Sequence, residues 1–519
     1  MTRRAPPARR RARAKTAPDA SAPPARRETG VPRLDYILKG GLFPGSTYVL
    51  EGPPGSGKTI LANHIAYRHA ADHDGQVVYI TLLVESHTRM LAHLRPLRFF
   101  REDLVGRQIV YVSGYGALRD GGLGGLAQLV RKMVRERQAT MLVVDGLESI
   151  VESALDPRAY REFIHELQGF TSLAECTTLL LTNLRPGGAH VENGLVDGVL
   201  ELTDSVIGSR AIRELIVHKF RGSDYLRGKH EVEIVAEGMV IHPRTEIQFD
   251  APPERATEER IRMMTGVAEL DRMLGGGVPS GSAVALLGSP GTGKTMLGLS
   301  FLVEGARRGE TGYYFGFYEP PPRLIEKVER IGLDLRRWVD KGLIKLIWQP
   351  PLEHMIDSLA EQLLETLRAD DRHRRRLFID GIEGFRAATV YPDRMGRFLS
   401  AFTNQLRTLD VTTMVAEELD LFSSTISMPN PELANVVESV ILLRYVELRS
   451  QLHRLISIMK MRESAYDTSI REFRITDGGV EVATSFASAE AILTGIGRVG
   501  RTGDAADRPA RGRARKAGR

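Results

Sequence analysis

The chain has 519 residues, a formal net charge of +6 and a single cysteine. This length allows two large domains, each with its own hydrophobic core. One cysteine excludes an internal disulfide, and because the sequence contains no apolar stretch long enough to cross a bilayer as a helix, we expect no transmembrane helix. We therefore expect a cytoplasmic protein that does not bind membranes.

The positive charge lies in the two tails. Residues 1–27 contain nine Arg or Lys and one Asp, and residues 498–519 contain eight and two, so the residues between them are net negative. Both tails are rich in Ala, Pro, Gly and Arg and have little to bury, and we predict that they are disordered. Basic tails either contact nucleic-acid phosphates or only improve solubility, and charge patterning alone favours the second role.

A repeat organises the rest of the chain. The pattern Thr-Gly-Val-x-x-Leu-Asp occurs at residues 29–35 and again at 265–271, each time 23 residues before a glycine-rich loop. Such spacing indicates a duplicated domain. We predict a first domain over residues 28–250, a polar linker over 251–259 and a second domain over 260–497. In both, short apolar runs alternate with helix-like segments, which is typical of a mainly parallel sheet flanked by helices.

Each predicted domain contains an octapeptide of the form G-x-x-x-x-G-K-[ST], at residues 52–59 and 288–295, between a strand-like and a helix-like segment. The backbone N–H groups of such a loop cradle phosphates, the Lys reaches the β- and γ-phosphates, and the hydroxyl ligates Mg²⁺. Two ATP sites are therefore expected. The candidate ATP-binding residues are Gly52, Gly55, Ser56, Gly57, Lys58 and Thr59 in the first loop, and Gly288, Gly291, Thr292, Gly293, Lys294 and Thr295 in the second.

Another apolar strand-like run follows in each domain and ends in an aspartate, Asp145 or Asp380. This is where a P-loop fold places the carboxylate that steadies Mg²⁺. We predict that each aspartate shares a Mg²⁺ with the loop hydroxyl of its own domain, Thr59 or Thr295.

The pattern Lys-x-Arg recurs near the end of each domain, as Lys219 with Arg221 and Lys460 with Arg462. Residues two apart in a strand project from the same face, so each pair could bring two cations to one phosphate group. A basic strand that merely discourages edge-to-edge aggregation is the alternative. Recurrence in both domains favours a functional role.

The chain resembles the KaiC family of double-domain RecA-like ATPases. The resemblance rests on the repeated Thr-Gly-Val-x-x-Leu-Asp pattern, both glycine-rich loops, both strand-end aspartates and both Lys-x-Arg elements. The resemblance covers almost everything between the tails. It implies an α/β fold of two tandem RecA-like P-loop domains, a homohexameric double ring and slow ATP hydrolysis. In some members it also implies serine/threonine autophosphorylation. Lys219, Arg221, Lys460 and Arg462 are then expected to act on the γ-phosphate held by a neighbouring subunit.

Two departures point to a divergent, non-clock member. Where the family has a Glu-Glu pair, this chain has Val84-Glu85 and Tyr318-Glu319, so Glu85 and Glu319 become the candidate catalytic bases. Carboxylates that only cap the next helix are the alternative. The adjacent Ser-Thr phosphoacceptors of the clock protein correspond to Ala434-Asn435, which cannot accept phosphate, although Ser and Thr residues lie nearby at 423–427.

The leading hypothesis is an ATP-binding, Mg²⁺-dependent, ring-forming ATPase with autokinase potential and a signalling protein as partner. A DNA-directed RecA-like motor that uses the basic tails is one alternative. The other is a regulatory scaffold that holds ATP with little turnover, because Val84 and Tyr318 replace the expected first Glu.

Overall fold

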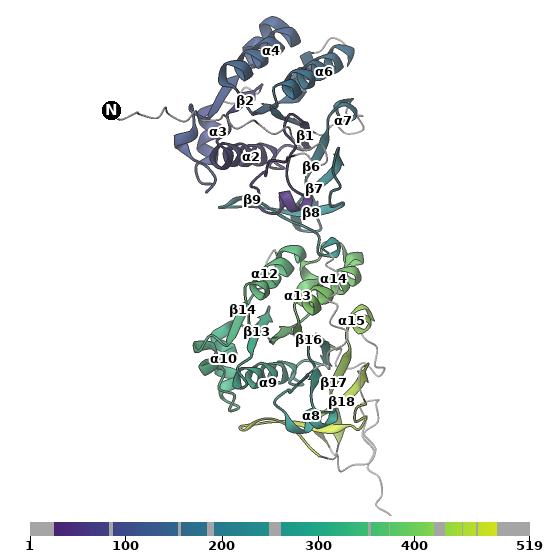
Figure 1. The fold of residues 1–519 in the computed structure, drawn as a ribbon. Coiled ribbons are helices and arrows are strands. Elements are labelled where there is room, and N and C mark those ends of the chain that lie inside the picture. Colours follow the sequence, from purple (N-terminus) through teal and green to yellow (C-terminus); the bar gives the residue numbers. More distant parts are fainter. Residues whose placement is uncertain are drawn as a thin grey trace, which may run out of the picture. The chain divides into compact units, whose positions relative to one another are not determined.

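The computed structural model describes residues 25–82, 87–153, 157–183, 191–248, 261–350, 354–372, 374–419, 431–448, 450–462 and 465–484. The chain divides into two compact units, Met1–Pro243 and Arg244–Arg519 (Figure 1). Most of both expected tails and the whole expected linker lie outside the described residues. Arg27 forms an isolated antiparallel bridge with Leu42, so the described fold of the first unit begins slightly before the expected boundary.

The first unit is built from a nine-stranded sheet with helices on its faces. Its strands are β1 (Thr47–Gly52), β2 (Val77–Thr81), β3 (Ile109–Ser113), β4 (Met141–Asp145), β5 (Thr177–Asn183), β6 (Gly198–Ile207), β7 (Arg210–Phe220), β8 (Lys229–Val235) and β9 (Gly238–His242). Its helices are α1 (Leu34–Ile37), α2 (Lys58–His73), α3 (His87–Leu94), α4 (Tyr115–Arg137), α5 (Leu147–Ser153), α6 (Pro157–Leu173) and α7 (Val191–Leu195), with a 3-10 turn at Glu102–Leu104.

The second unit repeats this plan. Its strands are β10 (Arg262–Met263), β11 (Val278–Pro279), β12 (Ala283–Gly288), β13 (Thr311–Gly316), β14 (Ile344–Trp348), β15 (Arg375–Asp380), β16 (Val411–Glu418), β17 (Ser439–Leu448), β18 (Gln451–Met461), β19 (Arg471–Thr476) and β20 (Gly479–Val482). Its helices are α8 (Ala268–Met273), α9 (Lys294–Arg307), α10 (Pro321–Glu329), α11 (Leu335–Asp340), α12 (Ile356–Arg368), α13 (Glu383–Ala388), α14 (Met395–Thr408) and α15 (Pro431–Val436), with 3-10 turns at Thr245–Ile247 and Pro392–Arg394.

The two sheets have the same strand order. The first is β3-β2-β4-β5-β1-β6-β7-β8-β9, and the second is β14-β13-β15-β16-β12-β17-β18-β19-β20. The first six strands of each order are parallel and the remaining strands are antiparallel. The predicted mainly parallel α/β fold is thus confirmed. In a parallel sheet the carboxyl ends of the strands share one edge, which places the loops after β1, β4 and β5 side by side.

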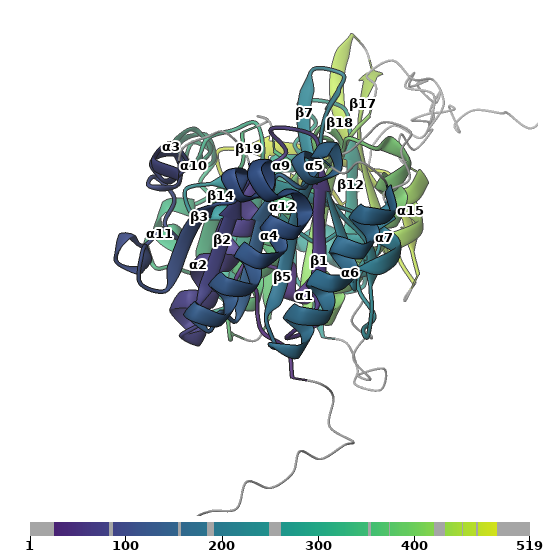
Figure 2. The same ribbon diagram turned by 90° about the horizontal axis from the view of Figure 1, so that it is seen from above.

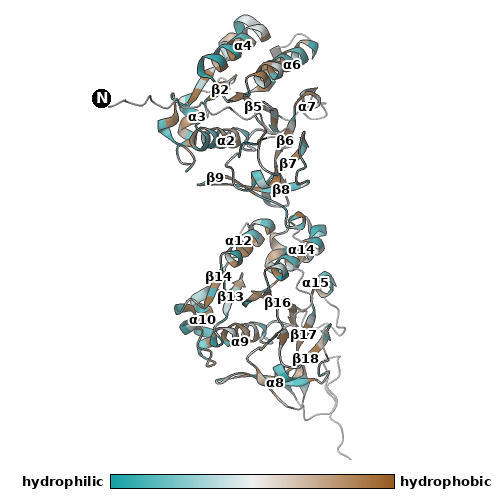
Figure 3. Ribbon diagram, viewed as in Figure 1, coloured by the Kyte–Doolittle hydropathy of each residue, from teal (hydrophilic) through white to brown (hydrophobic). Residues whose placement is uncertain are grey.

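Alternation along the central strand separates two hydrophobic cores in the first unit. Tyr48 and Leu50 pack with residues of α2 on one face, whereas Val49 packs with residues of α4 and α6 on the other. Figure 1 shows α2 below this sheet and α4 and α6 above it. Figure 3 shows hydrophobic residues running along the buried strands and polar residues on the outward sides of the helices. Burial on both faces explains why the strands read as short, uninterrupted apolar runs.

A long hairpin lies beside the central strand of each unit, formed by β6 and β7 or by β17 and β18. The hairpins extend beyond the other strands in the view of Figure 2. Each contains a register shift next to its Lys-x-Arg element, between Val199 and Leu200 or between Val440 and Ile441. Within the described residues no helix is long and apolar enough to span a membrane.

Candidate nucleotide sites

In both units the glycine-rich loop joins the central strand to a long helix. Helix α2 begins at Lys58 and helix α9 at Lys294, and the residues before them, Gly57 and Gly293, have left-handed φ angles of 100° and 108°. Neither helix start has a side-chain cap or an acidic residue in its first turn. The free N–H groups and the positive end of each helix dipole are therefore available to an anion.

The first glycine of each loop is required by close packing. A Cβ on Gly52 would lie 2.2 Å from the carbonyl oxygen of Leu202, and one on Gly288 would lie 2.7 Å from that of Leu443. Gly55, in the middle of the first loop, has φ 85° and open space where a Cβ would be. The start of the loop backbone is thus in close contact with the neighbouring strand, whereas the middle of the first loop has free space beside it. A phosphate-binding loop requires both features.

The predicted Mg²⁺ ligands meet in both units. Thr59 Oγ1 donates a hydrogen bond to Asp145 Oδ2 at 3.1 Å, and Thr295 Oγ1 lies 3.1 and 3.0 Å from the two oxygens of Asp380. Burial raises the pKa of both aspartates, while hydrogen bonds from the Thr hydroxyl and from a neighbouring Tyr hydroxyl lower it. A hydroxyl and a buried carboxylate side by side are the oxygen donors that hold Mg²⁺ on a nucleotide, so these residues fit the ion.

The loop lysine of the first unit is part of a short polar chain. Lys58 Nζ donates to the Gly52 carbonyl at 2.7 Å and to Asn183 Oδ1 at 3.0 Å, and Asn183 Nδ2 donates to Glu148 Oε1 at 2.9 Å. Burial lowers the pKa of Lys58, and the charges of Asp145 and Glu148 oppose that shift. A neutral amide therefore separates the lysine from the Glu148 carboxylate.

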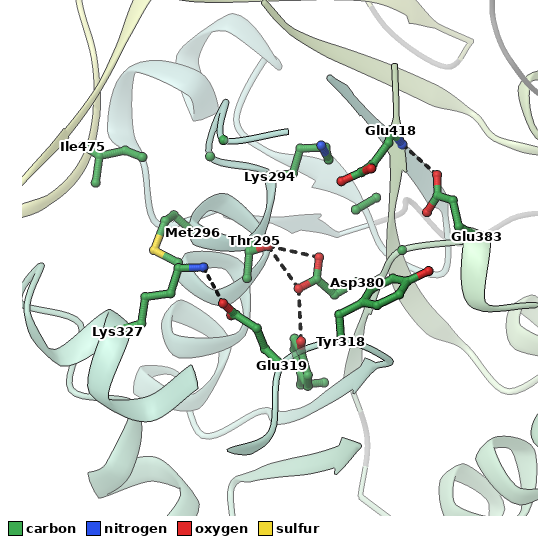
Figure 4. A pocket seen from close by; sticks show the side chains of 15 residues that line it. Lys294, Thr295, Met296, Tyr318, Glu319, Lys327, Asp380, Glu383, Glu418 and Ile475 are labelled. Atoms are coloured by element: carbon green, nitrogen blue, oxygen red, sulfur yellow. Dashed lines mark hydrogen bonds and ion pairs between the residues drawn. The ribbon is translucent and has the colours of Figure 1, made fainter. Parts of the chain in front are cut away.

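The second site is a cavity of about 360 Å³ at the equivalent position (Figure 4). Lys294 Nζ donates to the Gly288 carbonyl at 2.6 Å. Its pKa is lowered by burial and raised by the charges of Glu418, Asp380 and Glu383, in that order. This lysine faces carboxylates where the first unit offers an amide, because Glu418 pairs with Gly288 in the sheet register as Asn183 pairs with Gly52.

Of the two expected bases, Glu319 can be located. It lines the second cavity, its side chain is 34 % exposed, and it forms an ion pair of 2.8 Å with Lys327 on α10. Tyr318, in the place of the first family Glu, is 59 % exposed and also lines the cavity. Glu85 and Val84 lie outside the described residues, so the base of the first site stays a prediction.

The Lys-x-Arg side chains do not join the sites of their own units. Lys219 Nζ donates to the Asn193 carbonyl at 2.9 Å and to the Gly194 carbonyl at 3.3 Å, and Arg221 also reaches the Gly194 carbonyl, at 3.4 Å. In the second unit Lys460 donates to the Ala434 carbonyl at 2.7 Å. Both pairs therefore rest on a short helix beside the sheet, with Lys and Arg on the same side of the strand.

Sequence reasoning missed four polar residues of the sites. Glu148 and Glu383 each lie three residues after the strand-end aspartate, in a repeated Asp-Gly-x-Glu pattern that could have identified them. Asn183 and Glu418 end strands β5 and β16 and carried no motif. Behind the second site, burial and the nearby Glu383 charge raise the pKa of Glu417 to about 7.

The strand order, the loops and the Thr–Asp pairs define a pair of tandem RecA-like P-loop domains of the nucleotide-binding ATPase class. A family model described as "ATPase: KaiC" matches residues 27–246 and again residues 263–486. The chain therefore belongs to the KaiC family of ATPases, and its two halves are two copies of the family domain.

Similar proteins of known name place the chain among divergent members. It is 27% identical to the circadian clock oscillator protein KaiC of Picosynechococcus sp. over 478 residues, which is 89% of this chain and 90% of that protein. It is 25% identical to the circadian clock oscillator protein KaiC 1 of Synechocystis sp. over 483 residues, covering 90% and 91%. The likeness to KaiC of Synechococcus elongatus is 24%, over 91% of each chain.

Proposed function

We propose that the chain is a Mg²⁺-dependent ATPase that binds one ATP in each unit and hydrolyses it slowly. The observation that carries this proposal is the same constellation in both units, where a loop lysine, a loop threonine and a strand-end aspartate converge at a bare helix start. Each constellation supplies phosphate binding and a Mg²⁺ ligand pair, which are the parts that phosphoryl transfer needs most.

We also infer that each site is completed by a second copy of the chain in a homohexameric double ring. Strand β18, which carries Lys460, is two strands away from the central strand β12 in the sheet order. Lys460 and Arg462 bond to carbonyls of α15 and are not among the described residues that line the second cavity. A neighbouring copy is the simplest source of the cation that stabilises charge on a γ-phosphate.

One observation favours an ATP-holding scaffold as the second candidate function. The Glu319 carboxylate is paired with Lys327, and a carboxylate held by an ammonium group is a weaker base towards an attacking water. The second unit would then bind Mg-ATP and assemble, with little turnover of its own.

Two further expectations rest on residues outside the described part of the chain. Ser423, Ser424, Thr425 and Ser427, the candidate autophosphorylation sites, lie there, as do most of the basic tails. Autokinase activity and nucleic-acid binding therefore stay predictions, and so does a signalling-protein partner. Stimulation of ATP hydrolysis by DNA, with strong salt dependence, would favour the motor alternative.

The test is phosphate release paired with native mass measurement on the same samples, with and without Mg-ATP. We expect ATP-dependent hexamers and phosphate release that falls to background in the Lys58→Ala/Lys294→Ala double variant. Hexamers without phosphate release would support the scaffold. Neither assembly nor release above the double variant would overturn the proposal.

A further inference from the structure

A second polar cluster lies in the first unit on the sheet face opposite α2. It consists of Glu51, the last residue of β1 before the loop, Glu201 on β6 and His218 on β7. One ligand atom from each of these three residues lies within 4.8 Å of the other two. Glu51 and Glu201 are direct neighbours in the parallel register of β1 and β6.

The contacts within this cluster leave its charge unbalanced. Glu51 is only 4 % exposed, and the contact it makes among the described residues is a hydrogen bond of 3.1 Å from Asn193 Nδ2 on α7. His218 Nε2 lies 2.5 Å from Glu201 Oε2. No Lys or Arg of the described residues forms an ion pair with Glu51, and Lys219 donates instead to the Asn193 main chain. Two adjacent carboxylates, one of them buried, face a single imidazole, although a buried charge is costly unless a cation compensates it.

The second unit shows which residue types are sufficient for folding at the positions of this cluster. By sheet register and by the shared contacts of the two lysines, the counterparts of Glu51, Glu201, His218 and Asn193 are apolar in the second unit. They are Leu287, Leu442, Met459 and Ala434. The same fold is therefore built at this place with apolar side chains. The polar set of the first unit is an addition that the sheet does not require.

Asn193 strengthens the case from the helix side. Its Nδ2 donates to Glu51, and its Oδ1 is buried without a hydrogen-bond partner among the residues that the structure describes. This oxygen belongs to the amide group that donates to Glu51. A buried amide oxygen without a donor is costly, so this amide, like the Glu51 carboxylate it contacts, is a polar group that the fold leaves incompletely satisfied.

We propose that Glu51, Glu201 and His218 bind a divalent transition-metal ion, with Zn²⁺ as the best-matched probe. Two carboxylates and one neutral imidazole neutralise a 2+ charge, and this mixed oxygen and nitrogen set suits Zn²⁺. Ligand atoms around a zinc ion at about 2.1 Å lie about 3–4 Å apart, so small side-chain rotations bring the three groups into range. The ion would tie β1, β6 and β7 together, and β7 is the strand that carries Lys219.

The test uses the full chain, stripped with chelator and free of nucleotide, titrated with ZnCl₂ alone by isothermal titration calorimetry. The main variant is Glu51→Leu/Glu201→Leu/His218→Met, which installs the residues of the second unit. We expect one zinc ion fewer per chain in this variant than in the unaltered chain, with ATP binding and thermal unfolding preserved. Because both proteins keep both loops, zinc bound at the Mg²⁺ positions cancels in the comparison.

A single variant keeps the proposal testable if the triple variant fails to fold. His218 has a side chain that is 47 % exposed, so His218→Gln is expected to fold and to weaken the site at least tenfold. The matched control is His453→Gln in the second unit. His453 pairs with Glu472 at 3.1 Å, and within the described residues this pair is not part of a group of three possible metal ligands. Equal zinc affinity of the unaltered chain and His218→Gln, or an equal loss of affinity in His453→Gln, would overturn the proposal.

Discussion

The two nucleotide sites share a frame and differ in charge. In the first unit Lys58 is bridged by the neutral Asn183 to Glu148. In the second unit the cavity around Lys294 is lined by Glu319, Glu383 and Glu418 together with Asp380. Duplication therefore preserved the phosphate cradle and the Thr–Asp pair, whereas the strand-end residue next to the first glycine of the loop is Asn183 in one unit and Glu418 in the other. Two equal cradles can support two different catalytic rates, because binding and chemistry depend on different residues.

The largest expected effect concerns the cations supplied by a neighbour. We expect Lys219→Ala/Arg221→Ala to reduce turnover in the first sites, and Lys460→Ala/Arg462→Ala in the second, each by about 10³-fold, because a cation supplied in trans stabilises the transition state. ATP binding should change much less. Single-turnover phosphate release in a background that silences the other site, Lys294→Ala or Lys58→Ala, measures each rate.

Mixing experiments separate a trans role from local damage. Chains with Lys460→Ala/Arg462→Ala and chains with Lys294→Ala, each inactive at the second site, should regain part of that activity when they assemble together. Mixed rings contain interfaces that pair an intact loop with intact cations. Activity no higher than the sum of the separate samples would contradict the trans assignment.

Acid should destabilise the first unit more than the second. Burial lowers the pKa of His64 and His69, both on α2, to about 4. Well above pH 6.5 both histidines are neutral in the folded and unfolded states. As the pH falls from 6.5 towards 4, only the unfolded chain gains protons, so we expect each histidine to cost about 2 kcal/mol of stability at pH 5.

The second unit provides the internal control, since helix α9 has Ser300 and Gly305 at the corresponding places. Hydrogen exchange followed by mass spectrometry between pH 8 and pH 5, corrected for intrinsic exchange, should show α2 losing protection before α9. Equal loss in both helices would mean that the two histidines do not set the acid sensitivity.

A tenfold effect on phosphate release is expected from changes at the ion pair between Glu319 and Lys327. If Glu319 is the base of the second site, Glu319→Gln should lower phosphate release from that site by about tenfold or more. Lys327→Ala, which frees the carboxylate, should raise it. Both are measured in the Lys58→Ala background. A Glu383→Gln variant that falls further than Glu319→Gln would transfer the role to Glu383, whose Oε2, like that of Glu319, is buried without a hydrogen-bond partner in the described part of the chain.

The sequence alone predicted the parts of this molecule that repeat. Fold class followed from apolar runs such as residues 141–145, because strands buried on both faces must be continuously apolar. The meeting of Thr59 with Asp145 followed from the P-loop pattern and the spacing of the strand-end aspartate. These features depend on local residue patterns that survive duplication.

The contacts that make the sites unequal could not be predicted in this way. Glu319 follows the end of β13 by three residues, and the sequence around it reads the same whether its carboxylate is free or paired with Lys327 on the following helix. Asn183 and Glu418 reach their lysines only because β5 and β16 lie beside the central strands, which is a property of the sheet order and not of sequence spacing. Likewise, Glu51, Glu201 and His218 are distant in sequence and meet through strand register.

The smallest expected effect tests the charge difference directly. Glu418→Asn, in the Lys58→Ala background, should tighten ATP binding to the second site about fivefold at limiting Mg²⁺, because removing one charge near the phosphates is worth about 1 kcal/mol at a partly hydrated site. Asn183→Glu, in the Lys294→Ala background, should weaken the first site by a similar factor. Titration with a fluorescent ATP analogue measures both, and Glu326→Gln, an exposed residue on α10, controls for net charge. Because excess Mg²⁺ screens the phosphates, both differences should shrink as Mg²⁺ is raised; changes that persist at saturating Mg²⁺ would indicate altered loop geometry and not charge.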